Sequence, residues 1–243
     1  MVVGNYGSGK TEVAVNMAIA MARAGRSVSI ADLDIVNPYF RCREAQALME
    51  AEGIRVVVPP GSQAAADLPI IVPEIKGMLH PSEGNISLFD VGGDPVGAKL
   101  LSSFHAHLGG APYELWQVIN SRRPFTRDLA GCLKMREELE HSSRLKVTGL
   151  IANSHLVTET TAEVILEGYA LARETGRAAG IPVAFLTAMG ALADDPALDA
   201  IDVPILALER HMLPPWLKPA AGADDREVLP AGRAVPLGRR TGV

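Results

Sequence analysis

Short apolar runs alternate with longer amphipathic segments along most of this 243-residue chain. The short runs are apolar throughout rather than at every second position, which is typical of strands buried on both faces of a parallel sheet. The longer segments repeat their apolar residues at helical spacing. Strands and helices that alternate in this way predict right-handed βαβ units and an α/β fold with a mostly parallel, doubly wound sheet.

The pattern predicts a sheet of seven or eight strands, drawn from residues 1–3, 26–31, 54–58, 85–90, 113–119, 146–152, 182–186 and 203–208. Helices are predicted over residues 11–24, 41–51, 72–79, 98–105, 126–140 and 158–179. We expect Thr126 to cap the fifth helix and Gly180 to end the last one. Only three residues precede Gly4, so the first strand is either short or begins upstream of Met1.

The length suits one α/β domain, which we assign to residues 1–212. Composition changes from Pro214 onward, where five of the 17 prolines stand among Gly, Ala and Arg. Apolar residues there are too sparse to offset the entropy lost on ordering. Residues 213–243 are therefore predicted to be a mobile tail, and no function is assigned to them.

Charge and cysteine content narrow the class of protein. A net charge of −5 disfavours a dedicated nucleic-acid binder. Cys42 and Cys132 are too few for a disulfide framework, which suits the reducing cytoplasm. The chain has neither a signal-peptide pattern nor an uncharged run of the ~18–20 residues that span a bilayer. We predict a cytoplasmic protein with no membrane or nucleic-acid partner.

Residues 4–11 read Gly-Asn-Tyr-Gly-Ser-Gly-Lys-Thr and fit G-x-x-x-x-G-K-S/T. A predicted strand precedes them and a predicted helix follows, as a phosphate-binding loop and a P-loop NTPase fold require. Glycine permits the positive φ angles that turn backbone N–H groups toward a phosphate. We predict that the loop binds nucleotide through Gly4, Asn5, Tyr6, Gly7, Ser8, Gly9, Lys10 and Thr11. Within it, Lys10 acts on the terminal phosphates and Thr11 binds Mg²⁺. The alternative is a glycine-rich surface turn.

Polar side chains stand where predicted strands end, at Asp32, Asp34, Asp90 and Asn153. In a parallel sheet these ends share the edge at which ligands bind. Asp90 is predicted to hold Mg²⁺, and Gly93 to let the backbone approach the γ-phosphate. Of Asp32 and Asp34, one would share the metal and the other orient the attacking water. Each Asp has the alternative role of a helix cap or turn former.

Taken together, the loop, Asp32-Leu33-Asp34, Asp90-Val91-Gly92-Gly93 and Asn153 resemble the motifs of MinD/ParA/CobQ-type (SIMIBI-class) P-loop ATPases. The resemblance covers roughly residues 1–210. It implies that Asp34 orients the hydrolytic water, Asp32 and Asp90 act at the metal, and Asn153 reads adenine. It also implies ATP as the nucleotide and a dimer that forms face to face around two ATP molecules.

Several features depart from that family pattern. Relatives usually carry a second lysine where this chain has Asn5, and a glycine where it has Tyr6, so hydrolysis activated across a dimer lacks its usual cation. The chain has no C-x-C or C-x-x-C for a metal chaperone, and no basic amphipathic helix for membrane docking. Residues 153–156 do not match N-K-x-D, which favours ATP over GTP.

Three functions fit these residues. The preferred one is an Mg²⁺-dependent ATPase that dimerises with nucleotide and acts as a switch on a partner protein. The others are an ATP-dependent synthetase of the dethiobiotin-synthetase or cobyrinate-amidase kind, and a nucleotide-binding module without turnover. Arg122, Arg123 and Arg127 form a basic cluster for which phosphate contact, partner contact and simple solvation all stay open.

Overall fold

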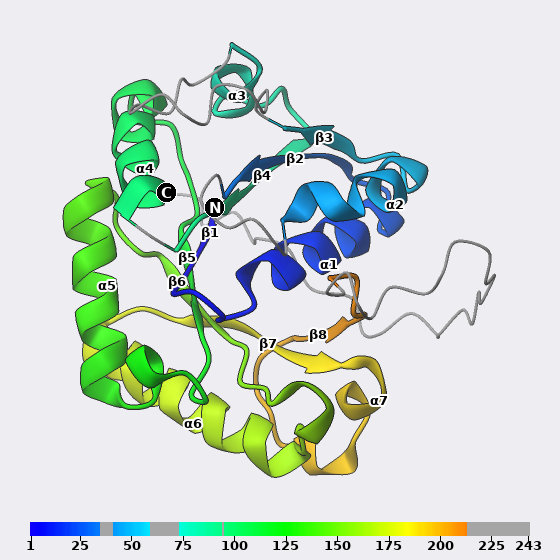
Figure 1. The fold of residues 1–243 in the computed structure, drawn as a ribbon, viewed down its shortest axis with the longest axis vertical. Coiled ribbons are helices and arrows are strands. Elements are labelled where there is room, and N and C mark those ends of the chain that lie inside the picture. The colour runs from blue at the N-terminus through cyan, green and yellow to red at the C-terminus, as the bar shows by residue number, and fades with distance from the viewer. Residues whose placement is uncertain (35–40, 59–72, 94, 213–243) are drawn as a thin grey trace.

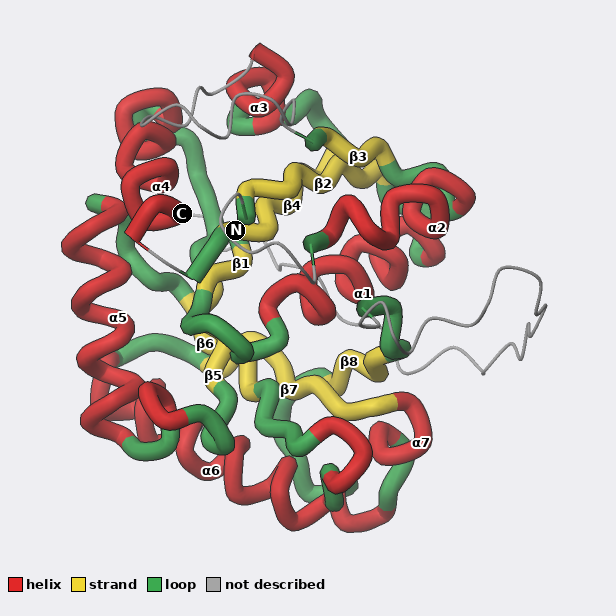
Figure 2. The backbone as a smooth tube through the Cα atoms, in the orientation of Figure 1, coloured by secondary structure: helices red, strands yellow, loops and turns green. Residues whose placement is uncertain are grey.

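Eight parallel strands form one sheet in the computed structural model of the chain, which describes residues 1–34, 41–58, 73–93 and 95–212 (Figures 1 and 2). The predicted tail, residues 213–243, lies outside the described residues. The strands are β1 (Val2–Val3), β2 (Ser27–Leu33), β3 (Arg55–Val57), β4 (Asn85–Val91), β5 (Trp116–Ile119), β6 (Gly149–Ala152), β7 (Val183–Met189) and β8 (Ile205–Leu208).

Helices connect the strands. They are α1 (Lys10–Arg23), α2 (Gln46–Ala51), α3 (Pro73–Met78), α4 (Pro95–Leu108), α5 (Leu129–Ser143), α6 (Ala162–Ala179) and α7 (Gly190–Ala193). Short 3-10 helices are η1 (Cys42–Ala45), η2 (Pro124–Thr126), η3 (Val157–Glu159) and η4 (Pro196–Leu198). The predicted fold class, a doubly wound α/β sheet of the P-loop NTPase type, is confirmed.

The first strand lies in the middle of the sheet although it has only two residues. The strand order is β3-β2-β4-β1-β5-β6-β7-β8, and Val2 pairs with Asp90 on one side and Trp116 on the other. Because β1 is central, the glycine-rich loop that follows it emerges at the middle of the carboxyl edge. The ends of β2 and β4 lie to one side of that loop, and the ends of β5 to β8 to the other.

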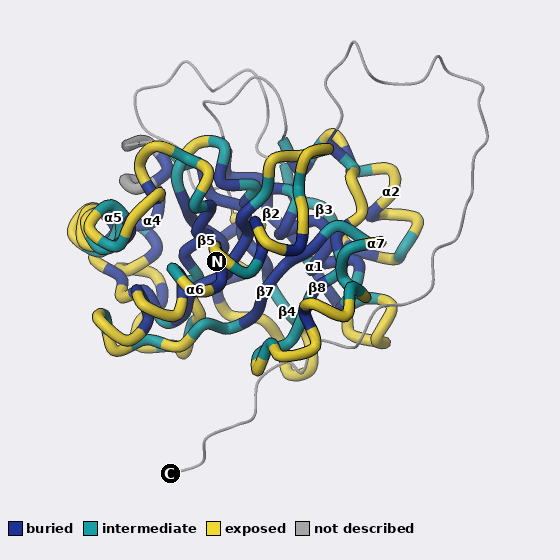
Figure 3. Tube along the Cα trace, turned by 90° about the horizontal axis from the view of Figure 1, so that it is seen from below, coloured by how far each residue is buried: buried dark blue, intermediate teal, exposed yellow. Residues whose placement is uncertain are grey.

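Consecutive strand residues point to opposite faces of the sheet, and both faces are apolar. Val2, Ile30 and Leu88 join a core with α1 and α2, whereas their neighbours Val3 and Phe89 join a second core with α3 to α6 (Figure 1). The central strands are accordingly coloured mostly as buried in Figure 3. This two-sided burial explains why the strand sequences are apolar runs rather than alternating patterns.

The structure corrects two predicted helix starts. Thr126 does not cap α5; Asp128 does, by accepting a hydrogen bond from Gly131 N at 2.8 Å. The Thr126 hydroxyl is buried and donates instead to Asn120 O at 2.8 Å. Similarly, α6 begins after the Thr161 cap rather than at residue 158. Each region offers several capping residues within one turn, and contacts distant in sequence select among them.

Among the described residues, no helix combines the length and the apolar character needed to cross a membrane.

Phe104 should be a main support of the core on the α4 side, because it is fully buried and packs edge-to-face on Phe89 at 5.3 Å between ring centroids. We expect Phe104→Ala to lower the free energy of unfolding by about 3–5 kcal/mol in urea denaturation. The control, Phe125→Ala, removes a ring that is 66% exposed and should change stability by less than about 0.5 kcal/mol. Equal effects of the two substitutions would contradict this assignment.

Candidate functional site

The loop between β1 and α1 presents an open helix end. Gly7 and Gly9 have φ of 74° and 85°, which only glycine adopts without strain. Gly9 is the N-cap residue of α1, and none of the side chains that the structure describes caps this end. Val13 N donates to Gly9 O at 3.0 Å, so the amides of Lys10, Thr11 and Glu12 come before the first such bond and have no carbonyl partner within the helix. Together with the helix dipole, these amides can bind an anion.

Asn5 shapes the loop from within. Its carbonyl accepts from Ser8 N at 3.1 Å, and its Oδ1 accepts from Tyr6 N at 2.8 Å. The Asn5 backbone carbonyl therefore closes a turn, and the Asn5 side chain accepts from the next amide, in the position where the resembling ATPases carry lysine. The Tyr6 ring is 67% exposed beside this turn.

Two side chains from the far half of the sheet hold the loop from outside. Arg123 Nε donates to Gly7 O at 2.8 Å, and Asn153 Nδ2 donates to Ser8 O at 2.7 Å. Asn153 Oδ1 in turn accepts from Thr187 Oγ1 at 2.6 Å. Both ends of the Asn153 amide are thus engaged in this conformation, and the reading of adenine by Asn153 stays a prediction.

The three arginines of the predicted basic cluster contact different partners in the structure. Only Arg123 reaches the loop, whereas Arg122 pairs with Glu167 and exposed Arg127 pairs with Asp128 at 3.5 Å. The sequence showed three arginines close together but could not show which one faces the loop. Thr187, which fixes Asn153, was not singled out; a polar residue inside an apolar strand was its only signal.

Gly93 brings the end of β4 against the loop. A Cβ on Gly93 would lie 2.2 Å from Gly4 O and 3.0 Å from Tyr6 N. No side chain fits there, so the glycine permits close approach of two backbones. Contact of Gly93 with a γ-phosphate stays a prediction.

Asp32 and Asp90 are paired residues of the neighbouring strands β2 and β4. Each lies two residues beyond a member of the core on the α1 side, Ile30 and Leu88, and therefore faces α1. Asp34 follows on the same face, and all three carboxylates are buried. The structure thus brings together the three acids that the sequence singled out.

The three carboxylates differ in their hydrogen-bond and ion-pair partners. Asp32 Oδ2 accepts from Arg43 Nε at 2.7 Å, and Lys10 Nζ lies 3.3 Å from Asp34 Oδ2. Neither carboxylate oxygen of Asp90 has a hydrogen-bond partner among the described residues, although Asp90 is 0% exposed. Burial raises the pKa of Asp90 to about 7; Lys10 opposes this shift and Asp32 adds to it.

These residues fit a magnesium ion. Mg²⁺ prefers carboxylate and hydroxyl oxygens, and Asp90 offers two buried oxygens that lack any other partner among the residues that the structure describes. Asp32 lies beside it, and the buried Thr11 belongs to the first turn of α1, the helix that covers this face. Asp32, Asp90 and Thr11 are the residues that would hold the ion.

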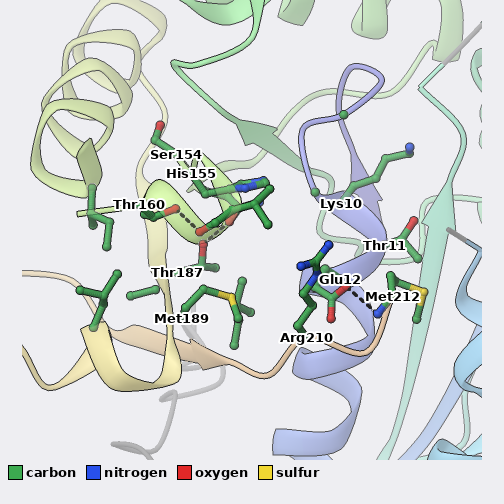
Figure 4. A pocket seen from close by; sticks show the side chains of 18 of the residues that line it. Lys10, Thr11, Glu12, Ser154, His155, Thr160, Thr187, Met189, Arg210 and Met212 are labelled. Atoms are coloured by element: carbon green, nitrogen blue, oxygen red, sulfur yellow. Dashed lines mark hydrogen bonds between the residues drawn. The ribbon is translucent and has the colours of Figure 1, made fainter. Parts of the chain in front are cut away.

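A cavity of about 630 Å³ opens on the other side of the loop (Figure 4). Figure 4 shows Glu12, Arg210 and Met212 on one side of it, and Ser154, His155 and Thr160 on the other. The remaining lining is largely apolar and includes Ile165, Ala188, Met189, Leu192 and Leu208. An apolar cavity with a few polar groups, next to an anion-binding loop, suits a base and a sugar.

His155 is a neutral hydrogen-bonding group in this cavity at neutral pH. Burial lowers its pKa, and the charges of Arg123 and Arg210 lower it further. A neutral imidazole offers one donor and one acceptor nitrogen.

The first turns of α1 fix the wall of the cavity that follows β8. The Glu12 carboxylate accepts from the backbone amides of His211 and Met212. Asn16 exchanges two hydrogen bonds with the backbone of Glu209, at 2.9 and 2.8 Å. Glu12 was not among the predicted site residues, because an acidic residue in a first helical turn is commonplace.

Comparison with known proteins gave a family match and several similar folds. A family model described as "CobQ/CobB/MinD/ParA nucleotide binding domain" matches residues 2–179. A search of curated proteins found no match.

Solved structures of FtsY are similar in fold. Chloroplast FtsY from Physcomitrella patens is 18% identical with a TM-score of 0.53, over 76% of this chain and 56% of that one. The signal recognition particle receptor FtsY from Elizabethkingia anophelis, in complex with GDP, is 17% identical with a TM-score of 0.50, over 77% and 56%. The chain thus spans just over half the length of these proteins, and the likeness concerns the fold alone.

The buried Asp90 should make the stability of the metal-free protein depend on pH. Its pKa of about 7 in the fold exceeds the value of about 3.9 in an unfolded chain. Its contribution to stability is therefore full below about pH 4 and is lost as the pH rises toward 7. In EDTA, Asp90→Asn should gain about 2–3 kcal/mol relative to the native chain between pH 5 and pH 8, measured by urea unfolding.

Asp199→Asn removes one exposed carboxylate and controls for the change in net charge. A difference between Asp90→Asn and the native chain that is constant over this pH range would contradict the prediction.

Proposed function

The chain belongs to the CobQ/CobB/MinD/ParA nucleotide-binding domain family, and on that premise we propose that it binds ATP with Mg²⁺ and hydrolyses it as a switch acting on a partner protein. One observation carries the proposal: the Asp90 carboxylate and the amino terminus of α1 lie at the same sheet edge, and neither has a side-chain partner within the described part of the chain. An anion site and a cation site side by side suit a magnesium nucleotide.

The loop amides and Lys10 would bind the phosphates. In the present structure Lys10 neutralises Asp34. A triphosphate competes with Asp34 for the Lys10 ammonium. Once Lys10 contacts the phosphates, the buried Asp34 carboxylate can accept a hydrogen bond from water and orient it for attack. Mg²⁺, when bound, supplies charge stabilisation to the phosphates.

The cavity favours adenine over guanine. Guanine presents two adjacent N–H donors, which proteins commonly satisfy with a carboxylate. Glu12 is the one acidic residue that lines the cavity within the described chain, and its carboxylate already accepts from His211 and Met212. Neutral His155 and the threonine hydroxyls can instead pair with the donor and acceptor edge of adenine.

Exposed apolar side chains near the loop support a nucleotide-dependent homodimer. Tyr6 and Val157 line the mouth of the cavity and are exposed, and Phe125 lies two residues beyond Arg123 and is also exposed. Exposed apolar groups gathered at one site are typical of an interaction surface. The partner protein would respond to the dimer, and we place both in the cytoplasm.

An ATP-dependent synthetase is the second candidate, because Asn5 replaces the lysine that dimeric relatives use across their interface. Binding without turnover is the third. The three candidates differ in what must be added before phosphate is released.

Nucleotide binding should appear as thermal stabilisation. ATP with Mg²⁺ at a hundred times its dissociation constant should raise the free energy of unfolding by about 2.7 kcal/mol, and GTP should do so less at equal concentration. Lys10→Ala should lose most of this effect, whereas Lys134→Ala, on the exposed face of α5, should keep it. Equal stabilisation by ATP and GTP would overturn the base preference.

Hydrolysis should require Asp34. Asp34→Asn should still be stabilised by ATP but should release phosphate at least about 100-fold more slowly, as expected when a water-orienting carboxylate is lost. Phosphate release by the native chain only after a small carboxylic acid is added would favour the synthetase. No release under any condition would favour the binding module.

Dimerisation is tested by light scattering coupled to size exclusion. The native chain should double in mass with ATP and Mg²⁺ and return to the monomer with EDTA, because the interface includes the occupied site. Tyr6→Ser should weaken the ATP-dependent dimer. A mass that does not respond to nucleotide would contradict the dimeric switch.

A further inference from the structure

A buried thiol lies beside the two paired carboxylates. We propose that Asp32, Asp90 and Cys42 form a three-ligand site that binds a transition-metal ion such as Co²⁺ or Zn²⁺ directly, without nucleotide. The inference goes beyond the proposed ATPase, which requires only Mg²⁺ and oxygen ligands.

The geometry is close to that of a bound ion. One donor atom of each residue, two carboxylate oxygens and the Cys42 Sγ, lies within 4.8 Å of the other two, and all three residues are buried. Bonds of 2.0–2.3 Å around a tetrahedral ion place ligand atoms about 3.3–3.7 Å apart. The three donor atoms therefore need to approach one another by at most about 1.1–1.5 Å, which rotamer adjustment can supply.

Asp90 provides a second, independent sign of a missing ligand. Both of its oxygens lack a hydrogen-bond partner within the described chain, and its exposed fraction is zero. Buried polar groups are almost always paired, and a buried carboxylate without a partner is costly. A cation in contact with Asp90 removes this cost.

The local charge also suits a divalent ion. Three buried carboxylates, Asp32, Asp34 and Asp90, face two cations, Lys10 and Arg43. Binding of a metal releases the Cys42 proton to the solvent and adds a thiolate to the cluster. Counted over the described residues, the cluster then carries two net negative charges, which a doubly charged ion offsets.

The thiolate decides which ions are preferred. Mg²⁺ prefers oxygen, whereas a sulfur ligand favours Zn²⁺, Co²⁺ and similar ions. Cys42 is held in place because it is the first residue of η1, packs in the core with α1, and is followed by Arg43, which binds Asp32. Three protein ligands leave a further coordination position for water.

Cobalt titration of the nucleotide-free protein tests the site. Cys132→Ser leaves Cys42 as the one cysteine of the chain and serves as the matched control. Co²⁺ added to this variant should produce a thiolate-to-cobalt charge-transfer band that saturates at one equivalent and is removed by Zn²⁺. Adding Cys42→Ser should abolish the band, and adding Asp90→Asn should weaken Co²⁺ binding at least about tenfold.

X-ray absorption of the zinc-loaded native chain gives a result that does not depend on any substitution. It should show one sulfur and otherwise oxygen ligands. Absence of a sulfur ligand, or a cobalt band that survives Cys42→Ser, would overturn the proposal. Stabilisation of Cys42→Ser by Mg²⁺ and ATP is measured separately, so failure of the metal site and failure of the nucleotide proposal are distinguishable.

Discussion

Buried charge at the carboxyl edge of the sheet is the constraint on which this structure depends. Asp32, Asp34 and Asp90 lie beneath the first turn of α1, where water cannot solvate them. Arg43 and Lys10 each neutralise one carboxylate, and the third has no partner in the described chain. Such a cluster lowers stability unless ions or ligands complete it. The buried carboxylates thus lower the stability of the ligand-free protein, and ligand binding at this edge of the sheet can raise it again.

The remainder of the sheet positions this cluster against an anion site. A central β1 places the glycine-rich loop between the acids of β2 and β4 and the polar side chains that follow β5 and β6. Arg123 and Asn153 donate hydrogen bonds to two carbonyls of the loop. The shape of the loop is therefore supported by side chains more than a hundred residues away, and not by its own sequence alone.

The same edge has two chemically different sides. On the β2 and β4 side, buried carboxylate oxygens of Asp32 and Asp90 and the Cys42 Sγ lie within 4.8 Å of one another, as donors to a cation could. On the side of β6 to β8, an apolar cavity with a neutral His155 suits an aromatic base. The amino terminus of α1 separates the two, and Glu12 and Asn16 on the same helix fix the cavity wall. Because α1 borders both sides of the edge, a ligand that moves α1 would change the geometry of the acidic cluster and of the cavity together.

The sequence by itself determined the fold class, the loop and the acids, because each depends on local chemistry: apolar runs buried on two faces, glycines that permit positive φ, and carboxylates that end strands. It placed the helix starts at residues 126 and 158 wrongly, since several capping residues compete within one turn. Only the tertiary structure decided that Arg123 rather than Arg122 reaches the loop, that Thr187 orients Asn153, and that Cys42 adjoins Asp90. These are contacts between residues far apart in the chain, and they follow from strand order and register, which local patterns do not encode.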